Sequence, residues 1–332
     1  MWAVRPVDDV LAVLAHWQLG EVRTIHKSPL GTMNDTFIVT TSDRLAVLRR
    51  HRLSRCRAMV EREHALMGHA RERGVPCPEV LWARSGEPLI EEGGRLYSLF
   101  EHAPGRQVRR CDLTAKHAAS LGSALAQVHD SIADCTPVRH RPRGEPKGTA
   151  DLPTSGETAA RLQRLLTVVQ QRRESTEADR WAEEHLRSRL AWLEANPGAP
   201  PTLASRESRT LHGDYQESNV FFDDQQRVCA VIDWDNAEYG CTSGELIRAM
   251  SLSFNIDAVL CQAFLDGYRE IRQADLDDLY LEAELYSWRK LHDTWLYDTV
   301  YLIGDSRPSR FIAPGSYTPF IDRWNGVHSK LH

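Results

Sequence analysis

The feature of this sequence that most limits its fold is a change of pattern near residue 105. Short β-rich runs separated by turn residues come before this point, and helical patterns fill most of the chain after it. Between residues 21 and 50 three such runs predict an antiparallel meander. The predicted elements of this part are strands at 22–25, 36–40, 45–48, 79–83 and 95–100, and helices at 7–17 and 57–73.

After Ala103-Pro104-Gly105 the pattern becomes helical, apart from one short β-rich segment at 209–232. The predicted helices cover residues 112–130, 157–172, 177–195, 242–253, 258–272 and 275–301. We therefore expect an α+β fold with a small β-rich amino-terminal lobe (1–100), a hinge (101–105) and a larger helical lobe (106–332). Joints of this kind are preferred places for ligand clefts.

Composition narrows the classes of function. The 332 residues carry a formal charge of -5 and a pI near 6.3, so nothing points to nucleic acid or an anionic membrane as partner. The seven cysteines are scattered and form no C-x-x-C pair, which argues against a disulfide framework and a zinc site. No signal peptide and no run of 18 apolar residues is visible. A cytoplasmic protein is expected, and its oligomeric state stays open.

The segment 211–235 contains the densest polar motif of the chain. Asp214 and Asn219 are five residues apart, and Asp233 ends an apolar run that predicts a buried strand. Phosphoryl transfer needs a carboxylate that takes the proton of the attacking hydroxyl and hard oxygen ligands that hold Mg²⁺. Asp214 suits the first task, and Asn219 and Asp233 suit the second.

The strings His212-Gly213-Asp214…Asn219 and Ile232-Asp233-Trp234-Asp235 resemble the aminoglycoside phosphotransferase/choline kinase superfamily, which includes homoserine-kinase-like members. The resemblance implies a protein-kinase-like two-lobed fold, ATP or GTP as donor and Mg²⁺ as cofactor. It also implies that the amino-terminal lobe covers the nucleotide and that the helical lobe binds the acceptor.

Weaker motifs in the first hundred residues agree with this resemblance. Gly31 lies in the loop that would cover the nucleotide, and Glu101 and Ala103 lie in the hinge that would contact it. Arg49 stands where the family has its phosphate-pairing lysine, and Glu63 matches the partner of that cation. Arg50 is the neighbouring alternative, but strand alternation favours Arg49.

The side chains of the motif also have plainer interpretations. Asp214, Asn219 and Asp233 could be turn and cap residues, but their spacing between strands makes that explanation poor. His212 is expected to be structural, since a buried and hydrogen-bonded histidine is the commoner case. Asp235 is a second carboxylate near Asp233, and we expect it to face the other way.

Residues 255–305 hold eleven Asp/Glu against four Lys/Arg, and aromatic residues that include Trp288, Trp295, Tyr286, Tyr297 and Tyr301 lie among them. One interpretation is a pocket for a cationic, amine-bearing substrate, with Asp293 and Trp295 as the first candidates. The other is a long amphipathic helix with solvated acids and core aromatics.

The function predicted from these features is transfer of the γ-phosphate of ATP or GTP to a hydroxyl of a small molecule. The acceptor would be an aminoglycoside-like or other antibiotic or an amino alcohol; homoserine, choline or a sugar is the alternative. A protein kinase is disfavoured, because residues after Asp233 run directly into a helix. A catalytically inactive scaffold would not need Asp214, Asn219 and Asp233 together.

Overall fold

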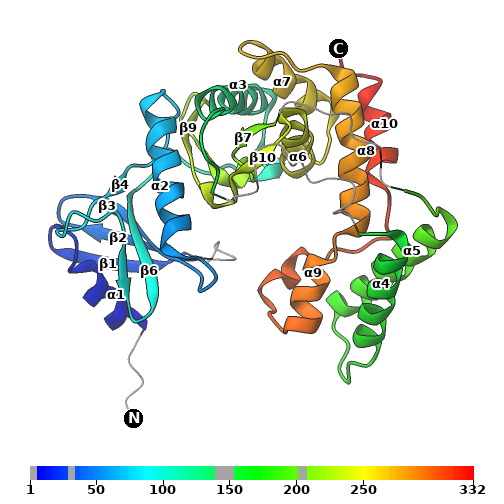
Figure 1. The fold of residues 1–332 in the computed structure, drawn as a ribbon, viewed down its shortest axis with the longest axis horizontal. Helices are drawn as coiled ribbons and strands as arrows, with labels where there is room; N and C mark the ends of the chain where they lie inside the picture. The colour runs from blue at the N-terminus through cyan, green and yellow to red at the C-terminus, as the bar shows by residue number, and fades with distance from the viewer. Residues whose placement is uncertain (1–5, 29–33, 139–152, 200, 202–207) are drawn as a thin grey trace. The chain divides into compact units, whose positions relative to one another are not determined.

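The computed structural model describes residues 6–28, 34–138, 153–199, 201 and 208–332 (Figure 1). The chain forms two compact units, each built from two stretches of sequence. Unit 1 contains Met1–Gly144 and Glu207–Ala274, and unit 2 contains Glu145–Arg206 and Asp275–His332. The lobe boundaries expected from the sequence stay a prediction.

An antiparallel sheet dominates the first hundred residues of unit 1. Its strands follow the order β1-β2-β3-β6-β4, and β5 pairs with the remaining length of β6. Every pairing is antiparallel, so the predicted meander of the first three strands is confirmed. The strands are β1 (Val22–Lys27), β2 (Asp35–Thr41), β3 (Leu45–Arg50), β4 (Val80–Leu81), β5 (Ile90–Glu92) and β6 (Arg95–Glu101).

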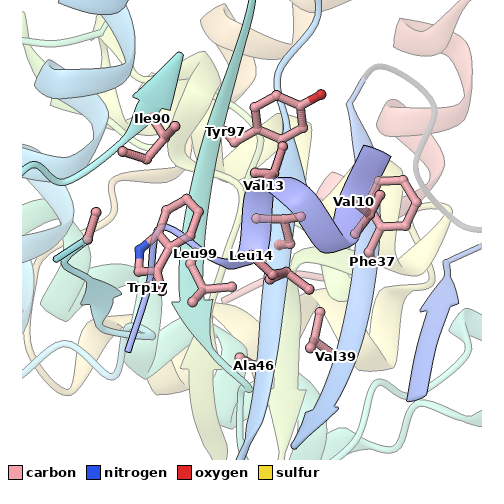
Figure 2. Close-up of a cluster of buried hydrophobic side chains, with 12 residues drawn as sticks. Val10, Val13, Leu14, Trp17, Phe37, Val39, Ala46, Ile90, Tyr97 and Leu99 are labelled. Carbon is pink, nitrogen blue, oxygen red and sulfur yellow. The ribbon is translucent and has the colours of Figure 1, made fainter. Parts of the chain in front are cut away.

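Helix α1 (Pro6–Leu14) covers one face of this sheet, as Figure 2 shows. Val10, Val13 and Leu14 of the helix, followed by Trp17, pack against buried residues of the strands. The indole of Trp17 donates a hydrogen bond of 2.8 Å to the carbonyl of Leu81, which satisfies its single polar group. The apolar spacing of residues 7–17 therefore serves to close the sheet on one side.

Helix α2 (Arg57–Glu72) begins soon after β3 and ends before Gly74, which has a φ of 88°. That left-handed conformation suits glycine, and Pro76 follows it, so the predicted end of the helix is confirmed. The helix buries a carboxyl group, that of Glu63, among its apolar residues. This arrangement directs a charged side chain from α2 towards β3.

The rest of unit 1 contains, over its described residues, two short β-ladders and three α-helices. β7 (Arg209–Leu211) pairs with β10 (Glu238–Gly240), and β8 (Val220–Phe222) pairs with β9 (Val228–Val231). The helices are α3 (Ala115–Ser131), α6 (Thr242–Phe254) and α7 (Ala258–Arg269). The polar motif thus lies on loops between short strands, as the sequence predicted.

Unit 2 is helical over its described residues, with its core between α4 (Ser155–Gln170) and α5 (Glu177–Ala195). The single helix expected over 275–301 is wrong: α8 (Leu276–His292) stops at Asp293, and α9 (Trp295–Tyr297) follows. Buried Arg189 explains the interruption, because it donates hydrogen bonds to the carbonyls of Leu291 and Asp293. A π-helical turn (Asp298–Ile303), a 3₁₀ turn (Arg307–Phe311) and α10 (Phe320–His328) complete the unit.

The expected α+β class, with an amino-terminal antiparallel sheet and helices after it, is confirmed. Among the described residues no helix has both the length and the apolar character that a bilayer crossing requires.

Candidate active site

The loop after β7 holds Asp214 and Asn219 against each other. Gly213 has a φ of 83°, and a Cβ there would overlap the carbonyl oxygen of Asn236, so the turn requires glycine. The side-chain nitrogen of Asn219 donates to the backbone carbonyl of Asp214 at 2.8 Å and to its Oδ2 at 3.2 Å. Because the nitrogen is used in this way, the amide oxygen is the atom that Asn219 can offer to a cation.

The β8–β9 hairpin brings Asp233 to the same place. Val220 pairs with Val231, and the backbone N–H of Ile232 donates to the carbonyl of Asn219 at 2.9 Å. Strand β9 has ended by then, and Asp233 adopts a left-handed conformation with a φ of 66°. Such a conformation is uncommon for a residue other than glycine, and it turns the chain sharply at this carboxylate.

Negative charge gathers around Asp233, whose side chain is one-third exposed. Burial raises the pKa of Asp233, and the nearby carboxylates of Asp235 and Asp214 raise it further, against the guanidinium of Arg49. A carboxylate surrounded in this way gains from an additional cation.

Arg49 is the cation that the structure places at Asp233. Its Nη1 lies 3.0 Å from Glu63 Oε1 and 3.4 Å from Asp233 Oδ1, so it bridges α2 and the turn after β9. Burial acts to lower the pKa of Arg49, but Asp233 and Glu63 together raise it. Arg50 points elsewhere and pairs with Asp35 at 2.5 Å. Arg49 is thus the one of these two arginines that contacts Glu63 and Asp233, and its contact with phosphates stays a prediction.

A second buried arginine, Arg55, was not singled out in the sequence. It pairs with Glu63 Oε2, and its Nη1 donates to the backbone carbonyl of Asp235 at 3.0 Å. Burial raises the pKa of Glu63 to about 7, while Arg49 and Arg55 act in the opposite direction. The two guanidiniums thus hold a carboxyl group that would otherwise be expensive to bury in its charged form.

Strand alternation does not decide where Asp235 points, because β9 ends before Asp233. Its carboxylate is buried and lies 3.7 Å from Arg55 Nη1 and 3.9 Å from Arg52 Nη2. Asn34, the first described residue after the segment that contains Gly31, donates to it at 3.4 Å. Asp235 therefore connects the turn after β9 to the strand region of unit 1.

A buried hydrogen-bond network holds the Asp214 loop from behind. Glu245 on α6 accepts from the backbone N–H of His212 at 3.2 Å and of Gly213 at 2.5 Å. Its other partner is His129 Nε2 at 2.9 Å. Burial acts to raise the pKa of Glu245, but the hydrogen bond and charge of His129 lower it, so the carboxylate form is favoured.

His212 has the structural role expected for it. Its Nε2 lies 3.0 Å from the carbonyl of Ile232, and its Nδ1 accepts from the backbone N–H of Asp214 at 3.3 Å. The ring packs against Trp234, with centroids 4.7 Å apart. His212 thereby joins the Asp214 loop to the Asp233 turn.

Arg248, also on α6, forms an ion pair with Asp214 that the sequence analysis missed. Its Nη2 lies 2.6 Å from Asp214 Oδ1. The spacing of Glu245 and Arg248 by three residues on a predicted helix was the available signal, since such residues share a face.

The expected hinge residues lie at the end of β6. The backbone N–H of Glu101 donates to the carbonyl of Glu79 at 2.9 Å, and its carboxylate lies 3.4 Å from Arg71. Ala103 is buried. Gly31 falls outside the described residues.

Asp293 and Trp295 lie in unit 2, in the interruption between α8 and α9. The Oδ1 of Asp293 accepts from the backbone N–H of Trp295 at 2.9 Å, and the Trp295 side chain is exposed. The structure thus brings these two residues together within unit 2.

The donor set of unit 1 fits Mg²⁺ bound jointly with phosphates. No group of three or more His, Cys, Asp or Glu side chains suited to a metal ion occurs in the part of the chain that the structure describes. Mg²⁺ does not need one, because it keeps several waters and binds through one or two carboxylates plus substrate phosphates. Asp233, with its raised pKa, and the amide oxygen of Asn219 are oxygen ligands of the required kind.

Comparison with known proteins identifies the class. Residues 24–286 match the APH phosphotransferase enzyme family, and because this range is most of the chain, the protein belongs to that family. The family resemblance expected from the sequence is therefore confirmed. At the level of the family, the expectation of an enzyme that transfers phosphoryl groups to an alcohol acceptor is confirmed as well.

Two curated relatives are homoserine kinases. That of Methylobacillus flagellatus is 26% identical over 271 residues, covering 78% of this chain and 74% of the relative. That of Xanthobacter autotrophicus is 33% identical over 126 residues, but this alignment covers only 38% of this chain and 39% of the relative.

Solved structures of kinases share the fold. A microcompartment-associated aminopropanol kinase has a TM-score of 0.60 at 20% identity, and the alignment covers 97% of this chain and 95% of the kinase chain. An aminoglycoside phosphotransferase from Alicyclobacillus acidocaldarius has a TM-score of 0.57 at 18% identity, covering 99% and 94%. Amicoumacin kinase, solved with AMP-PNP and Ca²⁺, has a TM-score of 0.56 at 15% identity, covering 96% and 97%. These likenesses confirm the protein-kinase-like fold.

Proposed function

We propose that this protein transfers the γ-phosphoryl group of ATP or GTP to a hydroxyl of a small amine-bearing molecule. The observation that carries the proposal is the convergence of Asp214, Asn219 and Asp233 from two separate loops, with Arg49 paired to Asp233. Turn or cap residues have no reason to gather in this way, whereas phosphoryl transfer needs this set of groups.

Asp214 is the group that would orient the acceptor hydroxyl and take its proton. Asn219 holds one oxygen of that carboxylate through its amide nitrogen, so the base is oriented before the acceptor arrives. Asp233 and Asn219 would hold Mg²⁺, which supplies charge neutralisation for the phosphates when bound. Arg49 would also neutralise negative charge on the phosphates, and Glu63 on α2 holds Arg49 in place.

The nucleotide would be held by the amino-terminal lobe (1–100), with Gly31 in the covering loop and Glu101 and Ala103 in the hinge (101–105). The solved complex of amicoumacin kinase contains an ATP analogue and a divalent cation, which supports this choice of cofactors. Residues 106–332 would supply catalysis and acceptor binding. A kinase that uses ATP is expected in the cytoplasm.

For the acceptor, the names of the relatives support a molecule that carries both an amine and a hydroxyl. Homoserine and aminopropanol are of this kind. An aminoglycoside-like antibiotic, an amino alcohol and homoserine fit this description, and choline carries a quaternary ammonium group in place of the amine. A sugar has the hydroxyl but no amine. Asp293 and Trp295 are the acceptor-binding candidates in unit 2.

The test is an Asp214→Ala variant assayed for acceptor-dependent release of ADP or GDP across hydroxylated metabolites and antibiotics. Loss of a general base should lower kcat by roughly 10²–10⁴-fold with little change in nucleotide affinity. Asp224→Ala, an exposed acid in the β8–β9 turn, is the matched control and should keep the parent rate. Activity of the Asp214 variant within threefold of the parent would contradict the proposal. Nucleotide binding without turnover of any acceptor would favour an inactive scaffold.

A further inference from the structure

Arg248 lies next to Asp214, the proposed base, and the reaction described above gives Arg248 no role. It projects from α6, and its Nη2 lies 2.6 Å from Asp214 Oδ1. Its side chain is 39% exposed, so the guanidinium is at the surface of unit 1 and not sealed in the core. A positive charge therefore stands beside the carboxylate that would receive the hydroxyl proton.

The two oxygens of Asp214 have different neighbours. Oδ2 faces Asn219, the candidate metal ligand, at 3.2 Å. Oδ1 faces Arg248 and also accepts from Gln216 Nε2 at 3.2 Å. Arg248 thus lies at the oxygen that does not face the candidate metal ligand, which favours a role towards the acceptor over one towards the nucleotide phosphates.

The position of Arg248 is fixed by its own helix. Glu245 lies three residues earlier on α6 and is tied to the backbone of His212 and Gly213. Residues three apart lie on the same face of a helix, so the anchor that holds the loop also sets the distance from Arg248 to Asp214. The guanidinium is therefore pre-positioned, which reduces the entropy lost when it binds a ligand.

We propose that Arg248 is a specificity-determining residue that selects acceptors with a carboxylate close to the reacting hydroxyl. A guanidinium forms paired hydrogen bonds with carboxylates and repels cations at short range. An acceptor with several ammonium groups around its hydroxyl, such as an aminoglycoside, would meet like charge at this point. A hydroxy amino acid would not, because its carboxylate faces Arg248 and its amine lies further away. This inference rests on the proposed function, since it places the acceptor at Asp214.

The test uses acceptor pairs that differ only by one carboxylate: homoserine and 3-aminopropan-1-ol, serine and ethanolamine, threonine and 1-aminopropan-2-ol, with aminoglycosides as the polycationic set. We expect the preferred acceptor to be one of the carboxylated compounds, with kcat/KM at least roughly tenfold above that of its partner, as for a lost charged hydrogen bond. Arg248→Gln should abolish this ratio, because only the carboxylated member loses a charged partner, whatever change in rate both members share through the contact of Arg248 with Asp214. Arg248→Lys should restore part of it, because the charge remains.

Arg227→Gln is the matched control, since Arg227 is an exposed arginine of unit 1 that pairs with Asp223 in the β8–β9 turn. It should leave the ratio unchanged, and thermal unfolding of each variant shows that the protein is folded. A ratio near one in the wild type, or a preferred acceptor among the aminoglycosides, overturns the inference and leaves the proposed function intact.

An equal fall for both members of a pair in Arg248→Gln, with the ratio preserved, would assign the guanidinium to the transferred phosphoryl group and overturn its role in specificity. Failure of the proposed function looks different. No compound would then be phosphorylated, and basal ATP hydrolysis would be the same in wild type and Asp214→Ala. That result would overturn the inference as well.

Discussion

Asp233 combines strain, negative charge and partial exposure in one residue. Its left-handed backbone costs free energy of order 1–3 kcal/mol, and neighbouring carboxylates oppose its ionisation. The guanidinium of Arg49, 3.4 Å away, offsets part of the repulsion between Asp233 and these carboxylates. Such residues persist where function needs them, and a bound cation would relieve the repulsion.

Replacement of Asp233 by Asn therefore tests the metal site. The variant keeps the size of the side chain and removes its charge, so nucleotide binding should become nearly insensitive to added Mg²⁺. Asn219→Ala should show a milder form of the same defect, because it removes a neutral ligand. Calorimetric titration of each variant with and without metal measures the effect. An unaltered Mg²⁺ dependence in the Asp233 variant would mean that other residues hold the ion.

His64 makes the protein sensitive to acid. It follows Glu63 on α2 and packs edge-on against Phe100, with ring centroids 5.6 Å apart. Burial, together with the positive charges of Arg49 and Arg55, lowers the pKa of His64 to about 3. The unfolded chain takes up a proton near pH 6.5, whereas the folded protein does not, so stability falls as the pH drops below 6.5.

His64→Gln should reduce this loss. Between pH 7 and pH 5 the free energy of unfolding of the variant should decline by about 1–2 kcal/mol less than that of the parent. Urea titrations at several pH values measure the slope. The exposed His26 on β1 provides the control, and His26→Gln should behave like the parent. Parallel pH profiles for all three proteins would show that His64 is not a source of acid sensitivity.

At the scale of elements, α3 and α7 approach so closely that glycine is required on both. A Cβ at Gly122 would overlap the carbonyl oxygen of Phe264, and one at Gly267 would overlap that of Ala119. Both obstacles are backbone atoms, which move only with their helix. The contact matters for the site, because α3 carries His129, which binds Glu245 behind the Asp214 loop.

Gly122→Ala should lower the free energy of unfolding by at least about 1–3 kcal/mol, the usual cost of overpacking. Gly68→Ala on α2 is the control, because a Cβ there meets nothing within 4 Å. That change should stabilise the protein by about 0.5–1 kcal/mol, since alanine favours a helix interior over glycine. Chemical denaturation measures both, and equal effects of the two substitutions would contradict this account of the α3–α7 contact.

Elements and site residues that depend on local sequence were predictable, and those that depend on distant contacts were not. Asp214 and Asn219 are close in sequence, and strand signals around them indicated the loop. The contacts of Arg55 with the backbone of Asp235 and of Glu245 with the backbone of His212 could not be predicted, because each joins residues that are far apart in the chain. The end of α8 at Asp293 also depends on a distant residue, Arg189, which binds carbonyls about one hundred residues away.

For the whole molecule, the chain divides its candidate residues between two units. Asp214, Asn219, Asp233, Arg49 and Glu63 belong to unit 1, whereas Asp293 and Trp295 belong to unit 2. Unit 2 is made of a segment inserted after residue 144 and the carboxy-terminal segment. If unit 2 serves the acceptor, changes there should alter acceptor kinetics and leave nucleotide kinetics intact.

Trp295 gives the means to test this division. Its indole is 47% exposed, and the bond from its backbone N–H to Asp293 fixes the start of α9. An amine over this ring would gain about 1 kcal/mol from a cation–π contact, which corresponds to roughly fivefold in acceptor KM. Trp295→Ala should therefore raise the acceptor KM by about that factor and leave the KM for ATP unchanged. Trp82→Ala is the matched control, because Trp82 is a 63% exposed tryptophan that belongs to unit 1. The acceptor KM could instead respond equally to both substitutions, or to neither. Either result would mean that the aromatic residues of unit 2 only pack within unit 2, and that unit 1 alone binds the acceptor.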